Sequence, residues 1–215
     1  MSQEAGLRER KKEQTRRLLA DTARRLFAER GFEAVKVAEV ARAADVSEAT
    51  VFNYFPTKED LFYSGLEAFE AELLSSIEDR ARGESVLAAF GRFVQEPRGL
   101  LAAKDPEAVE RFAATARVIE ASPSLLAREG RIFDAFTDSL AELLRRETGR
   151  RDDDLEPWVV ANALMGVHRA LVHFTRRRIL EGARNPGLSR AVRAQAKQSL
   201  AALEDGLGAY GTRRP

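Results

Sequence analysis

Hydrophobic residues recur at intervals of about three to four positions along most of this 215-residue chain, which is the spacing of one face of an α-helix. No segment shows the alternation of apolar and polar residues that is typical of a half-buried strand. Glycine and proline, at 14 and 7 residues, are sparse enough to favour helices over turns. The pattern therefore predicts an all-α protein.

The N-terminal part of the chain predicts three helices. The first has an apolar face around Leu19 and ends at Gly31, a typical residue after a helix C-terminus. Two short helices follow over residues 37–44 and 47–55, and Ser47 offers a hydroxyl to cap the later one. A turn this tight between small and branched residues predicts a helix-turn-helix. We expect its core to be filled by a set of apolar side chains: Val40, Ala41, Val46, Val51, Phe52 and Phe55.

A longer series of helices is predicted beyond this segment. Pro56 ends the third helix, and Thr57 with Asp60 forms a capping box for a fourth, which we expect to reach about Arg82. Further helices are expected over 86–94, from Asp105-Pro106-Glu107, from Ser122-Pro123-Ser124 to about Gly149, over 155–180 and over 188–207. We therefore expect a helix-turn-helix domain over residues 1–56 and a larger helical domain over residues 57–215.

Composition narrows the class of protein. The hydrophobic fraction of 44% and the charged fraction of 32% are those of a globular chain, and no segment approaches the roughly 20 apolar residues that span a bilayer. Without cysteine there is no disulfide framework and no thiolate metal site. We expect a soluble, cytoplasmic protein with no membrane partner.

Charge is unevenly distributed although the net charge is only +1. Residues 1–25 carry eight basic and four acidic side chains, a balance of 8 − 4 = +4. Such a basic N-terminal arm can approach phosphates. The alternative is a solvated tail followed by the polar face of a helix.

The second helix of a helix-turn-helix places its N-terminal residues against base edges in the major groove. We expect Tyr54 to rest its ring on the domain and offer its hydroxyl to a phosphate, and Lys58 to add a second phosphate contact at a helix N-terminus. The other DNA contacts expected from this geometry are Ser47, Glu48, Ala49, Thr50, Val51 and Asn53.

About the first 65 residues resemble the DNA-binding domain of TetR-type transcriptional repressors. The resemblance is carried by Gly31-Phe32, Val37-x-x-Val40-Ala41, Val46-Ser47, Thr50-Val51-Phe52-Asn53-Tyr54-Phe55 and Lys58-Glu59-Asp60-Leu61. It implies an all-α homodimer that binds a double-stranded DNA operator and is released by a small-molecule effector. It also implies that the last two helices, 155–180 and 188–207, pair with those of a second copy.

Two positions depart from the family pattern. Lys36 stands where a Thr commonly caps the second helix, so the cap hydrogen bond is expected to be lost at about 1 kcal/mol, while the ammonium can still meet a phosphate. Asp45 replaces the turn glycine, and aspartate tolerates the left-handed conformation better than most residues.

Aromatic residues of the second domain allow two interpretations. They can line an apolar effector pocket, or they can simply fill the core, since stripes at helical spacing do both. The expected pocket combines apolar side chains with polar groups among them: Phe90, Phe93, Phe112, Phe133, Phe136, Trp158, Met165, Phe174, Arg111, Arg117, Asn162 and His168. Residues 117–156 also loosely resemble regulators whose ligands are fatty acyl-CoA thioesters.

Nothing in the sequence supports catalysis, a metal or a cofactor. His168 and His173 are five residues apart and so lie on different helical faces, and Asp152, Asp153 and Asp154 precede a helix N-terminus without the spacing of a calcium loop. We expect no enzymatic activity. An alternative function is a helical small-molecule-binding or enzymatic domain that uses its helix-turn-helix for protein contacts.

Overall fold

The computed structural model describes residues 2–102 and 106–207. Within these ranges it contains helices and no strand, which confirms the predicted all-α class. The chain folds into two compact units. The first comprises Met1–Leu66 and Arg117–Arg128, and the second comprises Glu67–Ala116 and Glu129–Pro215. The predicted functional boundary after residue 56 stays a prediction, since compactness alone does not test it.

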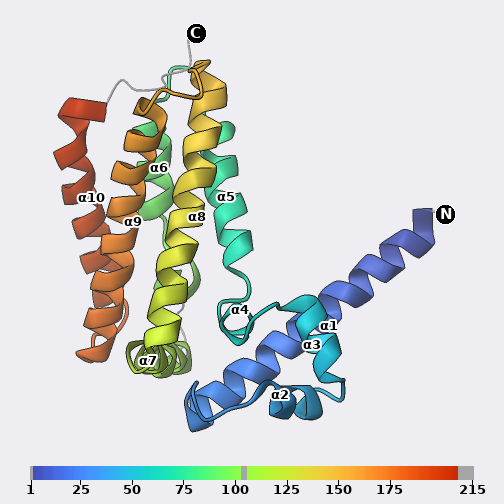
Figure 1. Cartoon of the computed structure of the whole chain (residues 1–215). Helices are drawn as coiled ribbons and strands as arrows, with labels where there is room; N and C mark the ends of the chain where they lie inside the picture. The colour runs from blue at the N-terminus through green and yellow to red at the C-terminus, as the bar shows by residue number, and fades with distance from the viewer. Residues whose placement is uncertain (1, 103–105, 208–215) are drawn as a thin grey trace. The chain divides into compact units, whose positions relative to one another are not determined.

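The first unit is built from four N-terminal helices (Figure 1): α1 (Ser2–Arg30), α2 (Val37–Ala43), α3 (Glu48–Tyr54) and α4 (Lys58–Phe62). Both α2 and α4 pack against α1, and α3 packs against α2. Phe27 of α1 lies at the centre of the core, with its ring centroid 5.1 Å from that of Phe32 and 5.9 Å from that of Phe62. These rings belong to the hydrophobic core against which the helix-turn-helix packs.

A distant part of the chain completes the core of this unit. Leu125 is fully buried in it and Ile119 nearly so. We call residues Arg117–Arg128, the end of α7 (Pro106–Glu120) and the start of α8 (Pro123–Thr148), the α7–α8 corner. Three polar interactions hold the corner: Ser122 Oγ donates to Glu33 (2.6 Å), Tyr63 OH donates to the Leu125 carbonyl (3.1 Å), and Arg128 pairs with Asp60 (2.6 Å).

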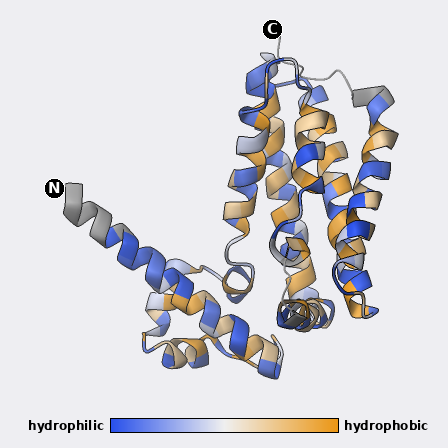
Figure 2. Ribbon diagram, turned by 180° about the vertical axis from the view of Figure 1, so that it is seen from behind, coloured by the Kyte–Doolittle hydropathy of each residue, from blue (hydrophilic) through white to orange (hydrophobic). Residues whose placement is uncertain are grey.

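The second unit is a helical bundle. It contains α5 (Leu66–Glu78), α6 (Val86–Gln95), the 3₁₀ helix η1 (Gly99–Ala102), most of α7 and α8, α9 (Glu156–Leu180) and α10 (Gly187–Leu207). Helix α10 packs along both α9 and α6. In Figure 2 the apolar residues of these helices gather on the inner faces of the bundle. None of the described helices is long and apolar enough to cross a bilayer.

The expected fourth helix is divided in two, which corrects the sequence prediction. Helix α4 ends at Phe62, and α5 begins at Leu66 after Gly65, whose φ of +95° a residue with a side chain rarely adopts. The Asp105 cap that we predicted for α7 lies outside the described residues. Helix α1 also begins far earlier than its apolar face predicts, at Ser2.

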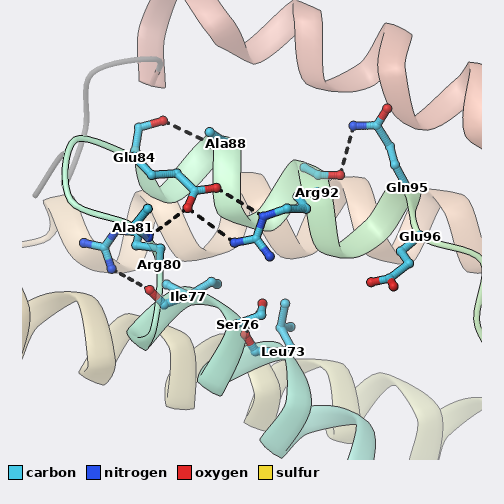
Figure 3. Close-up of polar contacts among 12 residues, drawn as sticks. Leu73, Ser76, Ile77, Arg80, Ala81, Glu84, Ala88, Arg92, Gln95 and Glu96 are labelled. Carbon is cyan, nitrogen blue, oxygen red and sulfur yellow. Dashed lines mark hydrogen bonds and ion pairs between the residues drawn. The ribbon is translucent and has the colours of Figure 1, made fainter.

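Buried charges connect the helices of the second unit. Arg176 of α9 pairs with Glu129 of α8, and both side chains are buried. Arg80, just after the end of α5, donates to the Ile77 carbonyl and pairs with Glu147 of α8 (2.6 Å). Figure 3 shows this turn, where Glu84 also accepts hydrogen bonds from the Ala81 amide and from Arg92 of α6.

Candidate functional site

The turn between α2 and α3 has the geometry of a helix-turn-helix. Asp45 adopts a left-handed φ of +55°, as expected for the residue that replaces the turn glycine. The Val46 amide donates to the Ala41 carbonyl (2.9 Å), and Ser47 Oγ accepts from the Thr50 amide (3.1 Å) as the N-cap of α3. Ala41 is buried in the crossing of the two helices. Local sequence therefore fixes how α3 leaves the turn.

Most of the expected DNA-contacting side chains lie on the surface of this unit. Lys36, Ser47, Glu48, Ala49 and Asn53 are exposed, while Thr50, Tyr54 and Lys58 are partly exposed. Their contacts with DNA stay predictions. Val51 is different, because its side chain is 1% exposed and belongs to the core. We therefore remove Val51 from the expected base contacts.

Phe52 corrects the sequence prediction in the opposite direction. We expected both Phe52 and Phe55 to point inward, but Phe52 is 47% exposed while Phe55 is 1% exposed. Helical geometry explains the difference: Val51 and Phe55 are four residues apart and share the buried face, and Phe52 is rotated about 100° from Val51. The exposed ring therefore stands on α3 beside Asn53. Strict helical spacing would have identified it in the sequence.

The Lys58 side chain packs against aromatic rings and is not simply extended into solvent. Its ammonium nitrogen lies 4.2 Å from the centroid of the Phe32 ring and 5.9 Å from that of Phe27. Desolvation by these neighbours lowers the pKa of Lys58 below its ordinary value. Thr57 and Asp60 form the predicted reciprocal capping box, each accepting from the other's amide at 3.1 Å. The box fixes the start of α4 and so the position of the Lys58 backbone.

Helix α2 is capped in an unexpected way. The Lys36 side chain gives no cap hydrogen bond, as predicted, but Glu39 Oε2 accepts from the Lys36 amide (2.9 Å) and its other oxygen pairs with Arg30 (2.7 Å). The backbone hydrogen bond and then the Arg30 guanidinium lower the pKa of Glu39. Glu39 thus replaces part of the contribution of a threonine cap, and the Lys36 side chain remains exposed.

Inside the second unit, several of the expected pocket residues come together. The His168 ring stacks on Phe69 at 4.9 Å between centroids and meets the Phe133 ring edge-on at 5.7 Å. Phe69 also lies against Phe93 (5.4 Å) and Phe136 (6.4 Å). We call these five residues the aromatic cluster. Burial lowers the pKa of His168 to about 4, so its imidazole is neutral at pH 7 and offers one donor and one acceptor.

The aromatic cluster joins helices far apart in the sequence. Phe69 lies on α5, Phe93 on α6, Phe133 and Phe136 on α8, and His168 on α9. Phe69 was not among the expected pocket residues, because its spacing from Leu66, Leu73 and Ile77 marks only the apolar face of a helix. The other expected pocket residues in the interior of this unit are Phe90 and Met165, which are buried.

The remaining expected pocket residues do not line the interior. Phe112 and Trp158 are 43% and 51% exposed, and Arg111 and Asn162 are exposed. Asn162 donates to the Trp158 carbonyl one turn earlier on α9 (2.9 Å). Arg117 is exposed and belongs to the first unit. Phe174 is partly exposed, with the Arg177 guanidinium 5.9 Å from its ring centroid.

An open cleft of about 610 Å³ lies beside the aromatic cluster, with Phe93 in its wall. The other lining residues come from α5, α6 and the segments that follow them: Ala71, Glu72, Ser75, Ser76, Asp79, Arg92 and Arg98. Arg98 covers the Phe93 ring at 3.9 Å. Because the cleft opens to the surface and most of its lining is polar or charged, it is not the enclosed apolar pocket that the sequence analysis expected.

Comparisons with known proteins agree with this geometry. Residues 19–64 match the family model for bacterial regulatory proteins of the tetR family, and residues 84–193 match that of the MftR C-terminal domain. The chain is 30% identical to the transcriptional regulator TcmR of Streptomyces glaucescens over 169 residues, which cover 77% of this chain and 75% of TcmR. It is 28% identical to the nucleoid occlusion factor SlmA of Pasteurella multocida over 167 residues, 77% of this chain and 82% of SlmA.

Solved structures show the same fold. A TetR-family transcriptional regulator from Rhodococcus sp. superposes with a TM-score of 0.52 at 20% identity, covering 91% of this chain and 99% of that chain. The family model covers the helix-turn-helix, and the similarity to TcmR extends over most of the chain. The chain therefore belongs to the TetR family of transcriptional regulators.

Proposed function

We propose that this chain is a ligand-responsive repressor, which binds a palindromic operator as a homodimer and is released by a small lipophilic molecule. Fatty acyl-CoA thioesters are one option for that molecule. Membership of a family of transcriptional regulators already identifies a DNA-binding regulator and confirms the expectation of no enzymatic activity. The lipophilic class rests on the aromatic cluster, and DNA binding, dimerisation and effector release rest on the observations below.

The outer face of α3 is the observation that carries the proposal. Ser47 and the start of α3 are exposed, and Phe52 and Asn53 continue the exposed surface one turn later. The face offers hydroxyl, amide, methyl and aromatic groups, which are suited to base edges and thymine methyl groups in a major groove. A cap at Ser47 and a buried Val51 hold this face in place.

Exposed apolar residues on α9 support a homodimer. Val159, Trp158 and Leu180 are 55%, 51% and 40% exposed, and Leu155, at the N-cap of the same helix, is 71% exposed. Large apolar side chains in contact with water commonly mark a protein interface. Between them the same helix presents a further set of exposed residues: Asn162, Gly166, Ala170 and His173. A twofold pairing of this face with that of a second copy would cover these residues.

Helix α8 supports coupling between effector and operator. Its first residues belong to the core of the first unit through Leu125, and its later residues supply Phe133 and Phe136 to the aromatic cluster. One continuous helix thus contributes to both the DNA-binding unit and the aromatic cluster, which we take as the proposed effector site. Rotation or translation of α8 on effector binding would change the α7–α8 corner and so the support of α1 and α4.

The experiment combines operator selection with effector titration. The operator is selected from random-sequence duplexes, and binding of purified protein to it is measured by fluorescence anisotropy at two salt concentrations, with and without candidate lipophilic molecules and acyl-CoA thioesters. Ultracentrifugation gives the mass of the free protein. The proposal predicts a dimer, a palindromic site and release by one ligand class. A selected site without symmetry, or a monomer, would contradict it.

A further inference from the structure

Helix α1 continues well beyond the core of the DNA-binding unit. Its first residue in that core is Leu19, although the helix begins at Ser2. The N-terminal half of α1 projects past α3 in Figure 1, and Figure 2 shows that its described part is hydrophilic. A helix without an apolar packing face is marginal in water. The projecting half therefore suggests a surface that meets a partner.

The face of α1 that packs on the core continues into this half as basic residues. Leu19 and Ala23 are fully buried, and Arg16, Lys12 and Arg8 precede them at spacings of about three to four residues. Arg8 and Lys12 are exposed. The side of the helix that is apolar within the unit is thus cationic beyond it.

Arg16 locates this basic face relative to the recognition helix. Its guanidinium donates to the Tyr54 carbonyl (3.3 Å) at the end of α3 and lies 4.7 Å from the centroid of the Phe55 ring. At about 1.5 Å per residue, Lys12 lies about 6 Å and Arg8 about 12 Å further along α1. Both cations therefore stand beyond the C-terminal end of α3, on the side of α1 that faces the unit.

The opposite side of α1 is different. Arg17 pairs with Glu13, Arg24 with Asp21 and Arg25 with Glu29, all within the helix. Among the side chains that the structure describes, which do not include those of Glu4 and Glu9, neither Arg8 nor Lys12 forms an ion pair. Cations that are not neutralised by neighbouring carboxylates attract phosphates most strongly.

We propose that the N-terminal half of α1 is a second DNA-binding element, in which Arg8 and Lys12 contact backbone phosphates that flank the base pairs read by α3. The inference rests on the proposed operator binding. It adds contacts outside the half-site, which strengthen binding without selecting sequence.

The test compares Arg8→Gln/Lys12→Gln with a matched control, Arg17→Gln/Arg25→Gln, which removes the same charge from the other side of α1. Affinity for the selected operator is measured against salt concentration on duplexes with and without about ten flanking base pairs, one helical turn, on each side. Circular dichroism checks that helix content is retained.

On flanked DNA we expect the Arg8/Lys12 variant to bind more weakly than the wild type. Because each phosphate contact contributes about 0.9 to the slope of log affinity against log salt, the loss of two contacts should make that slope shallower by about two for each protomer. The control variant should stay close to the wild type. On trimmed DNA the wild type should fall to the level of the variant.

Equal slopes for the Arg8/Lys12 variant and the wild type on flanked DNA would overturn the inference. A loss of the same size on trimmed DNA would also overturn it, because the contacts would then lie inside the half-site. Failure of the wild type to select any operator would overturn the proposed function itself, and this inference with it.

Discussion

The two units of this protein differ in the side chains that they expose. In the first unit, the surface around α3 presents mainly polar and charged groups beside one exposed ring, Phe52, and the core around Phe27 is built from apolar side chains. In the second, α9 exposes Trp158 and Val159, while the ion pair of Glu129 and Arg176 is buried. The difference supports the proposals that the first unit binds DNA and that the second pairs with a second copy of this chain. We therefore expect substitutions in the two interiors to have different effects on stability and on operator binding.

The largest effect is expected from breaking the buried ion pair of the second unit. Glu129→Ala leaves the Arg176 guanidinium buried without its carboxylate, which we expect to lower the free energy of unfolding by about 3–5 kcal/mol. Urea denaturation followed by circular dichroism measures the change.

The paired substitution Glu129→Leu/Arg176→Met is the control for this prediction. Replacing both charges by apolar groups of similar size removes the uncompensated charge, so the double variant should be much more stable than Glu129→Ala. If both variants were equally unstable, packing volume and not charge would explain the loss, and the contrast between the two interiors would disappear.

The next prediction uses two leucines of one helix. Leu125 and Leu140 of α8 are both fully buried, the first in the core of the DNA-binding unit and the second in the bundle. Replacing either by alanine should lower the free energy of unfolding by about 2–5 kcal/mol. Only Leu125→Ala should also weaken operator binding in conditions where the protein stays folded, as measured by anisotropy. Equal effects of the two on DNA affinity would show that the corner does not support the DNA-binding unit specifically.

These two predictions concern features that sequence did not reveal, and the reason is distance along the chain. Glu129 and Arg176 are 47 residues apart, and Leu125 joins a core formed mainly by residues 19–62. Periodicity indicates that a face is buried but not against what. The same limit explains why Phe69 was missed from the aromatic cluster.

Features set by neighbouring residues were predictable. The caps at Ser47 and Thr57 follow from residues within one turn of each other, and the all-α class follows from helical spacing along the chain. The left-handed Asp45 was expected from its position in the family's turn. Phe52 was misplaced because a run of aromatic residues was interpreted as a cluster, although its spacing from Val51 assigns it to another face. Local rules thus predicted the DNA-binding unit better than the bundle.

A smaller effect is expected from pH. His168 has a pKa of about 4 in the folded protein and near 6.5 in the unfolded chain. Below pH 6.5 the unfolded chain therefore binds a proton that the folded protein does not, and the free energy of unfolding falls until the pH reaches about 4. Between pH 7 and 5 this amounts to about 2 kcal/mol. His168→Phe keeps a ring against Phe69 but cannot titrate.

Urea denaturation of both proteins at pH 7 and pH 5 isolates the contribution of His168, since carboxylates titrate equally in each. The wild type should lose about 2 kcal/mol more than His168→Phe on acidification. The same loss in both proteins would mean that the imidazole is already hydrated in the folded bundle.

The smallest effect compares the same cap in the two units. Ser47 Oγ accepts from the Thr50 amide at the start of α3, and Ser85 Oγ accepts from the Ala88 amide at the start of α6, beside the turn in Figure 3. Either serine replaced by alanine should cost about 1 kcal/mol of stability, because one amide loses its partner. Only Ser47→Ala should weaken operator binding, since fraying of α3 moves the residues that face the bases, whereas α6 lies in the bundle. Operator affinity of the two variants is measured by anisotropy under conditions where both are equally stable. A weaker affinity for Ser85→Ala than for Ser47→Ala would contradict the prediction, because the bundle would then matter more for DNA binding than the recognition helix.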